Sequence, residues 1–356
     1  LRHVGRAAEA REYAERSRAA FEELHDATHL AHSLRLLGHI CSELGNSIEG
    51  KRHAGAALET FRAAGDKLGQ AQTEAVLAEI GYLLGDFESA RTLAAAGERH
   101  FASIDQPLGR GQCLLLSSWI EHSEGAVERS RRLALEARAE FERVGYRLGT
   151  AQANASLAHV EHRMLNLRSA EVGAQDALVA FEALRTPRGQ AACRRLLAMI
   201  AIDTDEPEIA ALNAEWSTRI YTDIDDPWGI VESKVLEAQV ALLRRDFARA
   251  GELLDESART EVEEPEPHQH HLLTQAWLFR EKGKQKEAVA LLDKAMRVFP
   301  DKRRVGDHTM HLLARLYRYA WPGEGAELLR SWRSELRRPA APVGSLTSMP
   351  PVTAPD

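Results

Sequence analysis

The sequence repeats itself with a period of about 40 residues, and this period constrains the fold more than any other feature. Aromatic residues mark it at Phe21, Phe61, Phe101, Phe141, Phe181 and Tyr221. A glycine follows eight residues after five of these positions, at Gly69, Gly109, Gly149, Gly189 and Gly229. Two columns kept in register over this length indicate structural repeats that stack on one another.

Each repeat is predicted to hold two helices, a helix A and a helix B, joined by tight turns. Between the turns, apolar residues follow helical spacing, as at Val76, Leu77 and Ile80. Ala, Leu, Arg and Glu dominate the composition, and these residues favour helices. Asp86 and Asn166 stand where an N-cap side chain would accept hydrogen bonds from the first free amides of helix B. Prolines mark the turn before helix A at Pro107, Pro187, Pro227 and Pro267.

Small side chains recur in the same register. One column reads Gly38, Ala78, Ser118, Ala158, Ala198 and Ala238, and the next, twelve positions on, reads Gly50, Ala90, Ser130, Ala170, Ala210 and Ala250. This spacing resembles the tetratricopeptide repeat, in which small side chains let helices A and B approach closely. The repeat is longer than the usual length of about 34 residues. It is similar to the extended form found in Leu-Gly-Asn repeat proteins and in the sensor arms of bacterial signalling ATPases and kinases. The resemblance implies an all-α, right-handed α-solenoid of about 17 antiparallel helices.

The same register predicts how the chain is divided. We expect residues 1–338 to form the solenoid, with a partial repeat over 5–22 and extended repeats over about 23–262. A unit of the shorter, usual type is expected over about 268–300, followed by a degenerate last pair over 307–337. Residues 339–356 are rich in Pro, Ser and Thr, and we expect a disordered tail or linker. Because the sequence begins at Leu1 instead of Met, we expect it to be part of a longer protein.

Charge and cysteine content exclude several classes of function. The net charge is −7, and the sequence contains no cluster of basic residues of the kind that binds nucleic acid. No uninterrupted apolar stretch approaches the roughly 18 residues that a membrane span needs, so none is expected. Cys41, Cys113 and Cys193 are too few and too scattered for a disulfide framework, and Cys113 and Cys193 are expected to lie too far apart to bond. A cytoplasmic location follows from this cysteine usage.

Histidine clusters are the strongest candidates for metal chemistry, and each has a simpler interpretation. His25 and His29 have zinc-protease spacing, but they fall at inter-repeat turn positions and are interpreted as exposed. His268, His270 and His271 follow an acidic, proline-containing stretch and are interpreted as part of a solvated loop. No phosphate-binding loop, Ser-His-Asp order or paired cysteine motif occurs. We therefore expect no cofactor, no metal and no catalytic residues, so this segment is not predicted to be an enzyme.

The resemblance implies that helices A line the concave surface of the solenoid. Polar and aromatic residues on these helices are the predicted partner-binding residues: Tyr82, Gln112, Trp119, His122, Gln152, His159 and His162. Gln and His supply directional hydrogen bonds, and Trp and Tyr supply anchoring area. An ordinary solvated surface remains an alternative. A metal held by His122, His159 and His162 is another, although a helix B is expected to separate successive helices A.

The function expected from this resemblance is a protein-interaction scaffold. It would act as the sensor arm of a larger bacterial signalling protein, such as a serine/threonine kinase, a signal-transduction ATPase or a transcription regulator. The groove would bind a protein or peptide, or a domain of the same chain. The family's clamp for a C-terminal carboxylate is not expected, because His39 and Met199 stand where that clamp has Asn. The alternative is a metal-dependent or ligand-binding module that uses the groove histidines.

Overall fold

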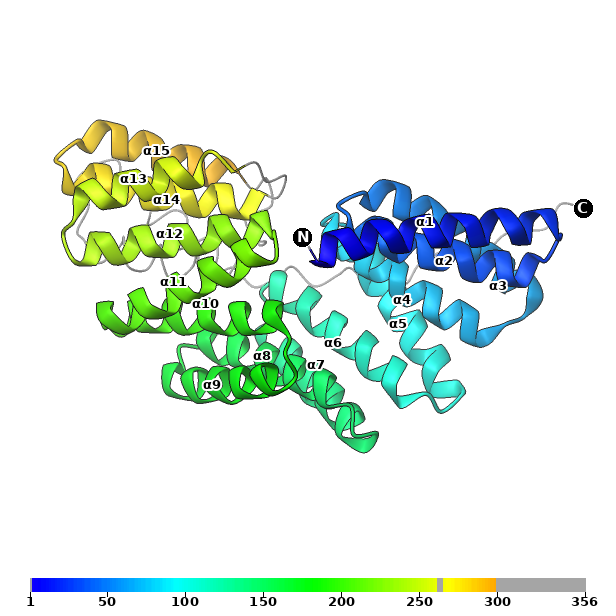
Figure 1. The fold of residues 1–356 in the computed structure, drawn as a ribbon. Helices are drawn as coiled ribbons and strands as arrows, with labels where there is room; N and C mark the ends of the chain where they lie inside the picture. The colour runs from blue at the N-terminus through cyan, green and yellow to red at the C-terminus, as the bar shows by residue number, and fades with distance from the viewer. Residues whose placement is uncertain (1, 261–264, 299–356) are drawn as a thin grey trace, which may run out of the picture.

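A computed structural model describes residues 2–260 and 265–298 of the chain, and within these ranges it contains helices and turns but no strand (Figure 1). The all-α prediction is confirmed, and most helices have 17 residues. The expected last pair over 307–337 and the tail over 339–356 lie outside the described residues. The helices are α1 (Arg2–Glu23), α2 (Ala27–Glu43), α3 (Ser47–Ala64), α4 (Lys67–Leu83), α5 (Phe87–Ser103), α6 (Pro107–Ser123), α7 (Val127–Arg143), α8 (Arg147–Arg163), α9 (Leu167–Ala183), α10 (Pro187–Asp203), α11 (Pro207–Asp223), α12 (Pro227–Leu243), α13 (Phe247–Ser257), α14 (Pro265–Glu281) and α15 (Gln285–Arg297).

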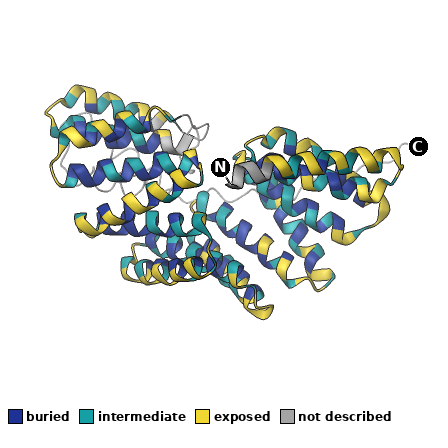
Figure 2. Cartoon of the chain, in the orientation of Figure 1, coloured by how far each residue is buried: buried dark blue, intermediate teal, exposed yellow. Residues whose placement is uncertain are grey.

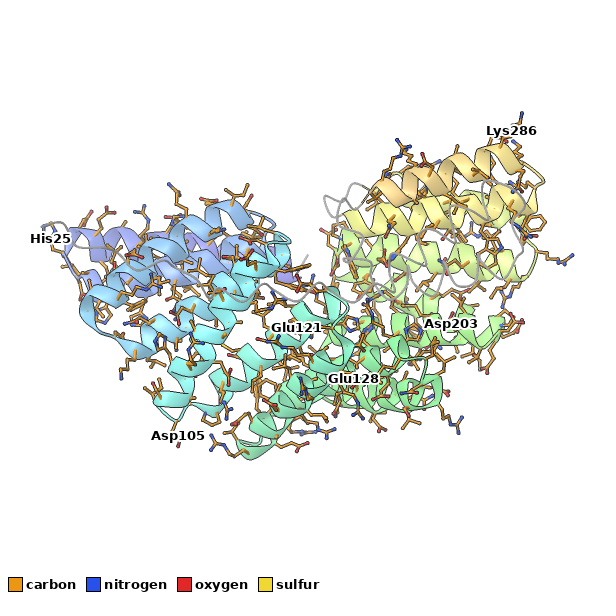
Figure 3. All side chains as sticks on the ribbon, turned by 180° about the vertical axis from the view of Figure 1, so that it is seen from behind. His25, Asp105, Glu121, Glu128, Asp203 and Lys286 are labelled. Atoms are coloured by element: carbon orange, nitrogen blue, oxygen red, sulfur yellow. The ribbon has the colours of Figure 1, made fainter. Side chains whose placement is uncertain are left out.

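From α1 to α13 the helices end at regular intervals of half a repeat, because each turn between them contains one residue with left-handed backbone. These residues are His25, Gly45, Gly65, Gly85, Asp105, Gly125, Gly145, Leu165, Arg185, Asp205, Asp225 and Arg245. Two of them, His25 and Asp105, lie at the tips of their turns in Figure 3. Each repeat therefore consists of two helix–turn units of equal length. Seven of the twelve turn residues are not glycine, so the position accepts side chains at a cost in backbone strain.

Side chains cap the N-termini of several helices, but not every N-cap that the sequence predicts is formed. The Asp86 carboxylate accepts a hydrogen bond from the Ser89 amide at 3.3 Å, as expected. The expectation for Asn166 is wrong, since its side chain makes no capping hydrogen bond to α9. Its Nδ2 instead donates to Glu161 Oε2 at 2.8 Å. An ionised carboxylate is a stronger hydrogen-bond acceptor than a neutral group. The side-chain NH2 group of Asn166 can donate to it, whereas the side-chain oxygen that would cap a helix can only accept.

The aromatic and glycine columns are in direct contact. The ring of Phe141 lies on Gly149, where a Cβ atom would come within 2.6 Å of the ring's Cγ. Tyr221 and Gly229 make the same contact two repeats later. In the first repeat His29 occupies the glycine position, and its ring stacks on Phe21 with centroids 5.0 Å apart. The period in the sequence therefore records one packing contact between the end of a helix B and the start of the next helix A.

The columns of small residues close the helix pairs, as the resemblance implies. Ala90 and Ala170 are fully buried, and a Cβ atom on Gly50 would come within 2.6 Å of the Gly38 carbonyl oxygen. Between α6 and α7 both columns contain serine, and Ser118 Oγ donates to the Ser130 carbonyl at 2.9 Å. Ser130 Oγ returns a bond to the Ser118 carbonyl at 2.8 Å. The hydroxyl groups are thus satisfied across the interface without widening it.

The helices form two layers, and the contacts between helices show which layer is on the inside. Helices A are the even-numbered helices from α2 to α14, and each contacts the next helix A. Among the described residues, no two successive helices B, the odd-numbered ones, are in comparable contact. Since helices A lie closer together, the solenoid curves toward them. The helices follow an open arc, with α1–α5 in one arm, α6–α9 at the base and α10–α15 in the other arm (Figure 1). Buried residues lie between the helices along the whole arc (Figure 2).

The three cysteines, Cys41, Cys113 and Cys193, are buried free thiols. Burial raises the pKa of Cys113 and of Cys193 to about 12, so both are protonated at neutral pH. Such thiols are inert packing groups. In the described ranges, no helix has the combination of length and apolar character that crossing a bilayer requires.

Candidate partner-binding face

All seven residues predicted to bind a partner lie on three neighbouring helices A. Tyr82 is on α4, Gln112, Trp119 and His122 are on α6, and Gln152, His159 and His162 are on α8. Because α4 contacts α6 and α6 contacts α8, these residues belong to adjacent parts of the inner layer. We call the surface that α4, α6 and α8 form on this inner layer the inner face.

Five of the seven residues form a row across these helices. The rings of Tyr82 and Trp119 have centroids 6.3 Å apart, and those of His122 and His159 are 6.4 Å apart in an edge-on arrangement. Trp119 and His122 are separated by three positions on α6, as are His159 and His162 on α8, so each pair shares one side of its helix. The expectation that a helix B separates successive helices A is therefore wrong, since side chains of successive helices A touch directly.

Trp119 is half-buried and packs against two parts of the core. One part includes Ala78 and Leu116, and the other includes Leu115 and Ala153. The indole thus joins the packing of consecutive repeats while part of its surface remains on the inner face. A substitution of Trp119 will therefore affect stability as well as any binding.

His162 has a different position from the other members of the row. Its side chain is fully buried, and its Nε2 lies 2.9 Å from Asp203 Oδ2 at the end of α10. It therefore fixes α8 against α10 and presents no surface of its own to a partner. Gln112 is exposed and Gln152 is half-buried, both about two helical turns before the row. Their amide groups remain close to solvent.

Charged side chains extend the inner face beyond the row. Glu79 on α4 keeps 46% of its side chain exposed, and His39 Nδ1 on α2 lies 3.7 Å from its carboxylate. Desolvation by the surrounding helices raises the pKa of the Glu79 carboxyl, and the charges of His39 and Arg188 act in the opposite direction. Arg188 stands at the start of α10, three repeats away from α4. The electrostatic surroundings of Glu79 therefore include a charge on a helix A three repeats away.

The histidine clusters considered for metal binding have other partners. His29 Nδ1 lies 2.8 Å from Asp26 Oδ2 in the first turn of α2, and His25 is exposed in the preceding turn. The expectation of a solvated loop at 268–271 is wrong, because α14 already begins at Pro265. His270 is buried there and its Nδ1 lies 2.8 Å from Glu232 Oε1 on α12. Burial lowers the pKa of His271 to about 4, and its Nδ1 lies 2.9 Å from Ser257 Oγ.

One group of potential metal ligands was missed by the sequence analysis. In the described part of the chain, a single set of three His, Cys or carboxylate side chains brings its ligand atoms within 4.8 Å of one another: Cys41, Glu49 and His53. The groove histidines do not form such a set. Glu49 and His53 are four positions apart in a predicted helix B, and this spacing is the one signal in the sequence that pointed to them. The approach of Cys41 depends on how α2 packs on α3.

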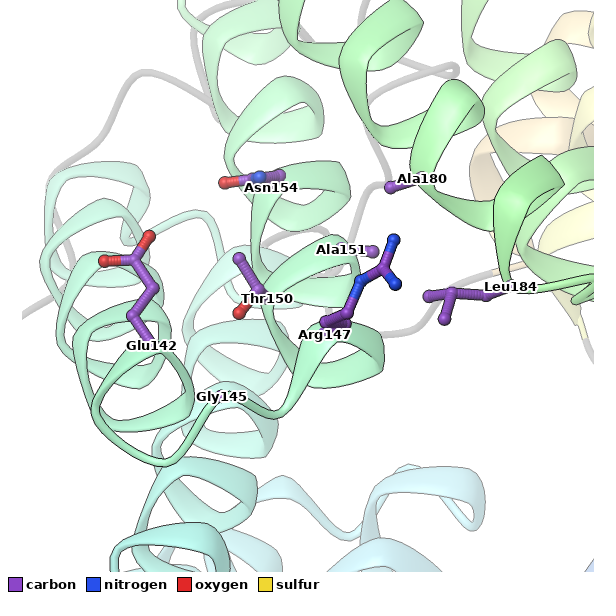
Figure 4. A pocket seen from close by; sticks show the side chains of 8 residues that line it. All are labelled: Glu142, Gly145, Arg147, Thr150, Ala151, Asn154, Ala180 and Leu184. Carbon is purple, nitrogen blue, oxygen red and sulfur yellow. The ribbon is translucent and has the colours of Figure 1, made fainter.

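A hollow of about 350 Å³ opens at the ends of α7, α8 and α9 (Figure 4). It is lined by Glu142, Gly145, Arg147, Thr150, Ala151, Asn154, Ala180 and Leu184. The side chains that α8 contributes lie on a different side of that helix from Gln152 and His159. The hollow is therefore separate from the inner face.

The comparisons with known proteins identify the fold. No family model matches the sequence, and no curated protein sequence matches it. A Rap protein complexed with competence and sporulation factor is similar in structure, with a TM-score of 0.56, 13% identity, and coverage of 85% of this chain and 77% of that one. The apo form of RapI gives 0.58 at 12% identity, covering 75% and 97%. A Signal Transduction ATPase with Numerous Domains from Pyrococcus horikoshii, which has a tetratricopeptide repeat sensor, gives 0.51 at 19% identity, covering 74% and 39%.

Identities this low bear on the fold alone. They agree with the helix pairs, the buried columns of small residues and the inner layer of helices A described above. The chain therefore folds as an α-solenoid of helix pairs, similar in structure to the sensor repeats of the Pyrococcus horikoshii protein and to the Rap proteins.

Proposed function

We propose that this chain is a protein-interaction scaffold that binds a protein or peptide segment on the inner face. The observation that carries the proposal is the row from Tyr82 to His159, which places two large aromatic rings and two imidazoles on adjacent helices A. Solenoid proteins use their concave surfaces for binding because several repeats contribute to one continuous face. Aromatic side chains at the centre of such a face are the residue types that dominate binding energy.

The chemistry of the face suggests how a partner segment would bind. An apolar side chain of the partner would pack on Tyr82 and Trp119. The amides of Gln112 and Gln152 would bond to the partner's backbone, since each amide group both donates and accepts. His122 and His159 would add polar contacts. His162 would act indirectly, by holding α8 in place through Asp203.

Two similar structures support a role in signalling, by analogy only. The Rap protein is described in complex with a factor, and the Pyrococcus horikoshii protein carries its repeats as the sensor of an ATPase. We infer that this chain likewise serves as a sensor or docking arm of a larger signalling protein. A domain of that protein is then one of its potential partners. We assign no catalytic step to this segment, and we place it in the cytoplasm, where three free thiols stay reduced.

The test is to capture partners on the intact chain and to measure their affinity. Photo-crosslinking residues introduced at Gln112 and Gln152 would mark the partner segment, and a synthetic copy of that segment would be titrated against the protein. We expect Trp119→Ala combined with His159→Ala to weaken binding by about 2 kcal/mol, or roughly 30-fold in Kd. Because Trp119 also packs in the core, the double variant must unfold at the temperature of the wild type. If it does not, His159→Ala with Gln152→Ala takes its place.

The matched control is Trp216→Ala. Trp216 lies on α11, a helix B, and is 44% exposed. The Trp216→Ala substitution removes a tryptophan side chain from the outer layer and should leave the Kd for the partner segment unchanged. If the folded inner-face variant captures every partner as well as the wild type, the proposal is wrong. Loss of binding in Trp216→Ala alone would place the site on the outer surface, where Ile209 and Leu212 are also exposed.

A metal-dependent function of the groove histidines receives no support from the geometry. His162 is committed to Asp203, and the three imidazoles are not among the groups of potential ligands that converge in the described residues. The metal-ligand set that does converge lies elsewhere in the chain.

A further inference from the structure

Three side chains of the metal-binding types converge where α2 packs on α3. Cys41 contributes a thiol from the last turn of α2, and Glu49 and His53 contribute a carboxylate and an imidazole from α3. One ligand atom of each lies within 4.8 Å of the other two. Glu49 and His53 are four positions apart and therefore face the same way on α3. The set spans both helices of the first complete pair.

The distance between the two α3 side chains fits two ligands of one ion better than a hydrogen bond. His53 Nε2 and Glu49 Oε1 are 3.6 Å apart, which is too long for a hydrogen bond. Two ligands at about 2.0–2.1 Å from a tetrahedral zinc ion are separated by about 3.4 Å. Other buried histidines of this chain close on their carboxylates, since His162 lies 2.9 Å from Asp203 and His270 lies 2.8 Å from Glu232. The side chains of His53 and Glu49 on α3, in contrast, do not close to hydrogen-bonding distance.

The imidazole of His53 has an unmet requirement. Its side chain is 11% exposed, and its Nε2 atom is buried without a hydrogen-bond partner in the described part of the chain. A buried nitrogen left in this state costs free energy that a bound ligand would recover. Because Nε2 is also the atom that faces Glu49, the space between these two side chains is where that ligand belongs.

The surroundings would support an ion at this position. Arg11 Nη2 on α1 contacts both carboxylate oxygens of Glu49, at 2.8 and 3.1 Å, and so fixes the direction of the carboxylate. Carboxylates that bind metals commonly have such an outer hydrogen-bonding partner. Cys41 is fully buried, whereas Glu49 is 33% exposed and leaves a path from solvent. A thiolate, an imidazole and a carboxylate together match the preferences of zinc.

We propose that Cys41, Glu49 and His53 bind one divalent transition-metal ion of the zinc type, with three protein ligands and a fourth position open to water. The site is separate from the inner face, so it stands or falls independently of the proposed partner binding. A bound ion would link α2 to α3 directly, and to α1 through Arg11. It would therefore brace the first helices of the arc.

Cobalt provides the test, because a thiolate bound to Co²⁺ absorbs in the near ultraviolet while imidazole or carboxylate ligands alone do not. The full chain, freed of metal with a chelator, would be titrated with Co²⁺ and then with Zn²⁺. We expect one thiolate-bound cobalt per chain, displaced by zinc, and slower hydrogen exchange in α2 and α3 on binding. His53→Gln should weaken binding at least about tenfold, since losing even an outer-shell partner costs about 10–100-fold.

Cys113→Ser is the matched control, because Cys113 is also a buried free thiol but belongs to no such set among the described residues. It should keep the cobalt absorption, and Cys41→Ser should abolish it. If Cys41→Ser does not fold, His53→Gln decides the matter, because its side chain borders solvent. Absence of a thiolate–cobalt band in the wild type overturns the proposal. So does an unchanged band in Cys41→Ser, or an unchanged affinity in folded His53→Gln.

Discussion

At the scale of single residues, the contact between an aromatic ring and a glycine gives the sequence its period. Phe141 is fully buried, and its ring occupies the space that a side chain at position 149 would need. Glycine is required there for close approach and not for its backbone freedom. The residue column thus follows from packing between one repeat and the next.

Gly149→Ala tests this interpretation. The new Cβ atom would lie 2.6 Å from Phe141 Cγ and 2.5 Å from Tyr146 Cδ1, so one of these rings or α8 must move. We expect a loss of about 1–3 kcal/mol in the free energy of unfolding, measured by urea denaturation.

The control for that substitution is Gly55→Ala in α3. No atom lies within 4 Å of a Cβ built at Gly55, and this glycine is inside a helix. The same chemical change should therefore stabilise the protein by about 0.5–1 kcal/mol. Equal effects at both positions would show that the ring contact is not what selects glycine at position 149.

At the scale of elements, the turns limit nearly every helix of the extended repeats to the same length. A residue with left-handed backbone ends each of these helices. Between α8 and α9 this residue is Leu165. The bonds from the Leu165 amide to the His162 carbonyl and from the Asn166 amide to the Glu161 carbonyl, at 2.9 Å each, satisfy the end of α8. This arrangement is the Schellman motif, which favours glycine at the position of Leu165.

Leu165→Gly should therefore stabilise the chain. Leu165 has φ of 64° and is 68% exposed, so the substitution removes backbone strain and few contacts. We expect a gain of about 0.5–1.5 kcal/mol in the free energy of unfolding. The reverse change at an equivalent turn, Gly145→Ala, should cost a similar amount, because Gly145 has φ of 67°. A loss of stability in Leu165→Gly would mean that the leucine makes a contact worth more than the strain.

The sequence was sufficient to predict most of the helices but not the side-chain contacts between helices and turns. The positions of helices A and B and the columns of small residues between them were predicted from spacing. The bond from Asn166 to Glu161, the start of α14 at Pro265 and the burial of His162 were not, because each depends on a partner from another turn or helix. For the candidate site, the sequence placed the seven residues on helices A. The direct contact between neighbouring helices A, which makes five of them a row, came only from the structure.

At the scale of the whole molecule, each helix pair contacts its neighbours, and stability should be local. Ala170 on α9 is fully buried and belongs to the same core cluster as Ala158 on α8. Ala170→Leu should open this pair by overpacking, at a cost of about 1–3 kcal/mol. Hydrogen exchange should accelerate in α8 and α9 and remain unchanged in α2 and α3. Faster exchange along the whole described chain would show that the repeats unfold as one unit.

The even spacing of the turns has a consequence for how such a chain can change its length. Removal of half a repeat would delete one helix and send every later helix B into the inner layer, with its surface side chains facing the core. Removal of a whole repeat, for example 107–146, would restore both layers and rejoin Gln106 to Arg147 between turns of the same kind. Insertions and deletions that keep the fold must therefore come in whole pairs. The arc can be lengthened or shortened only in these steps.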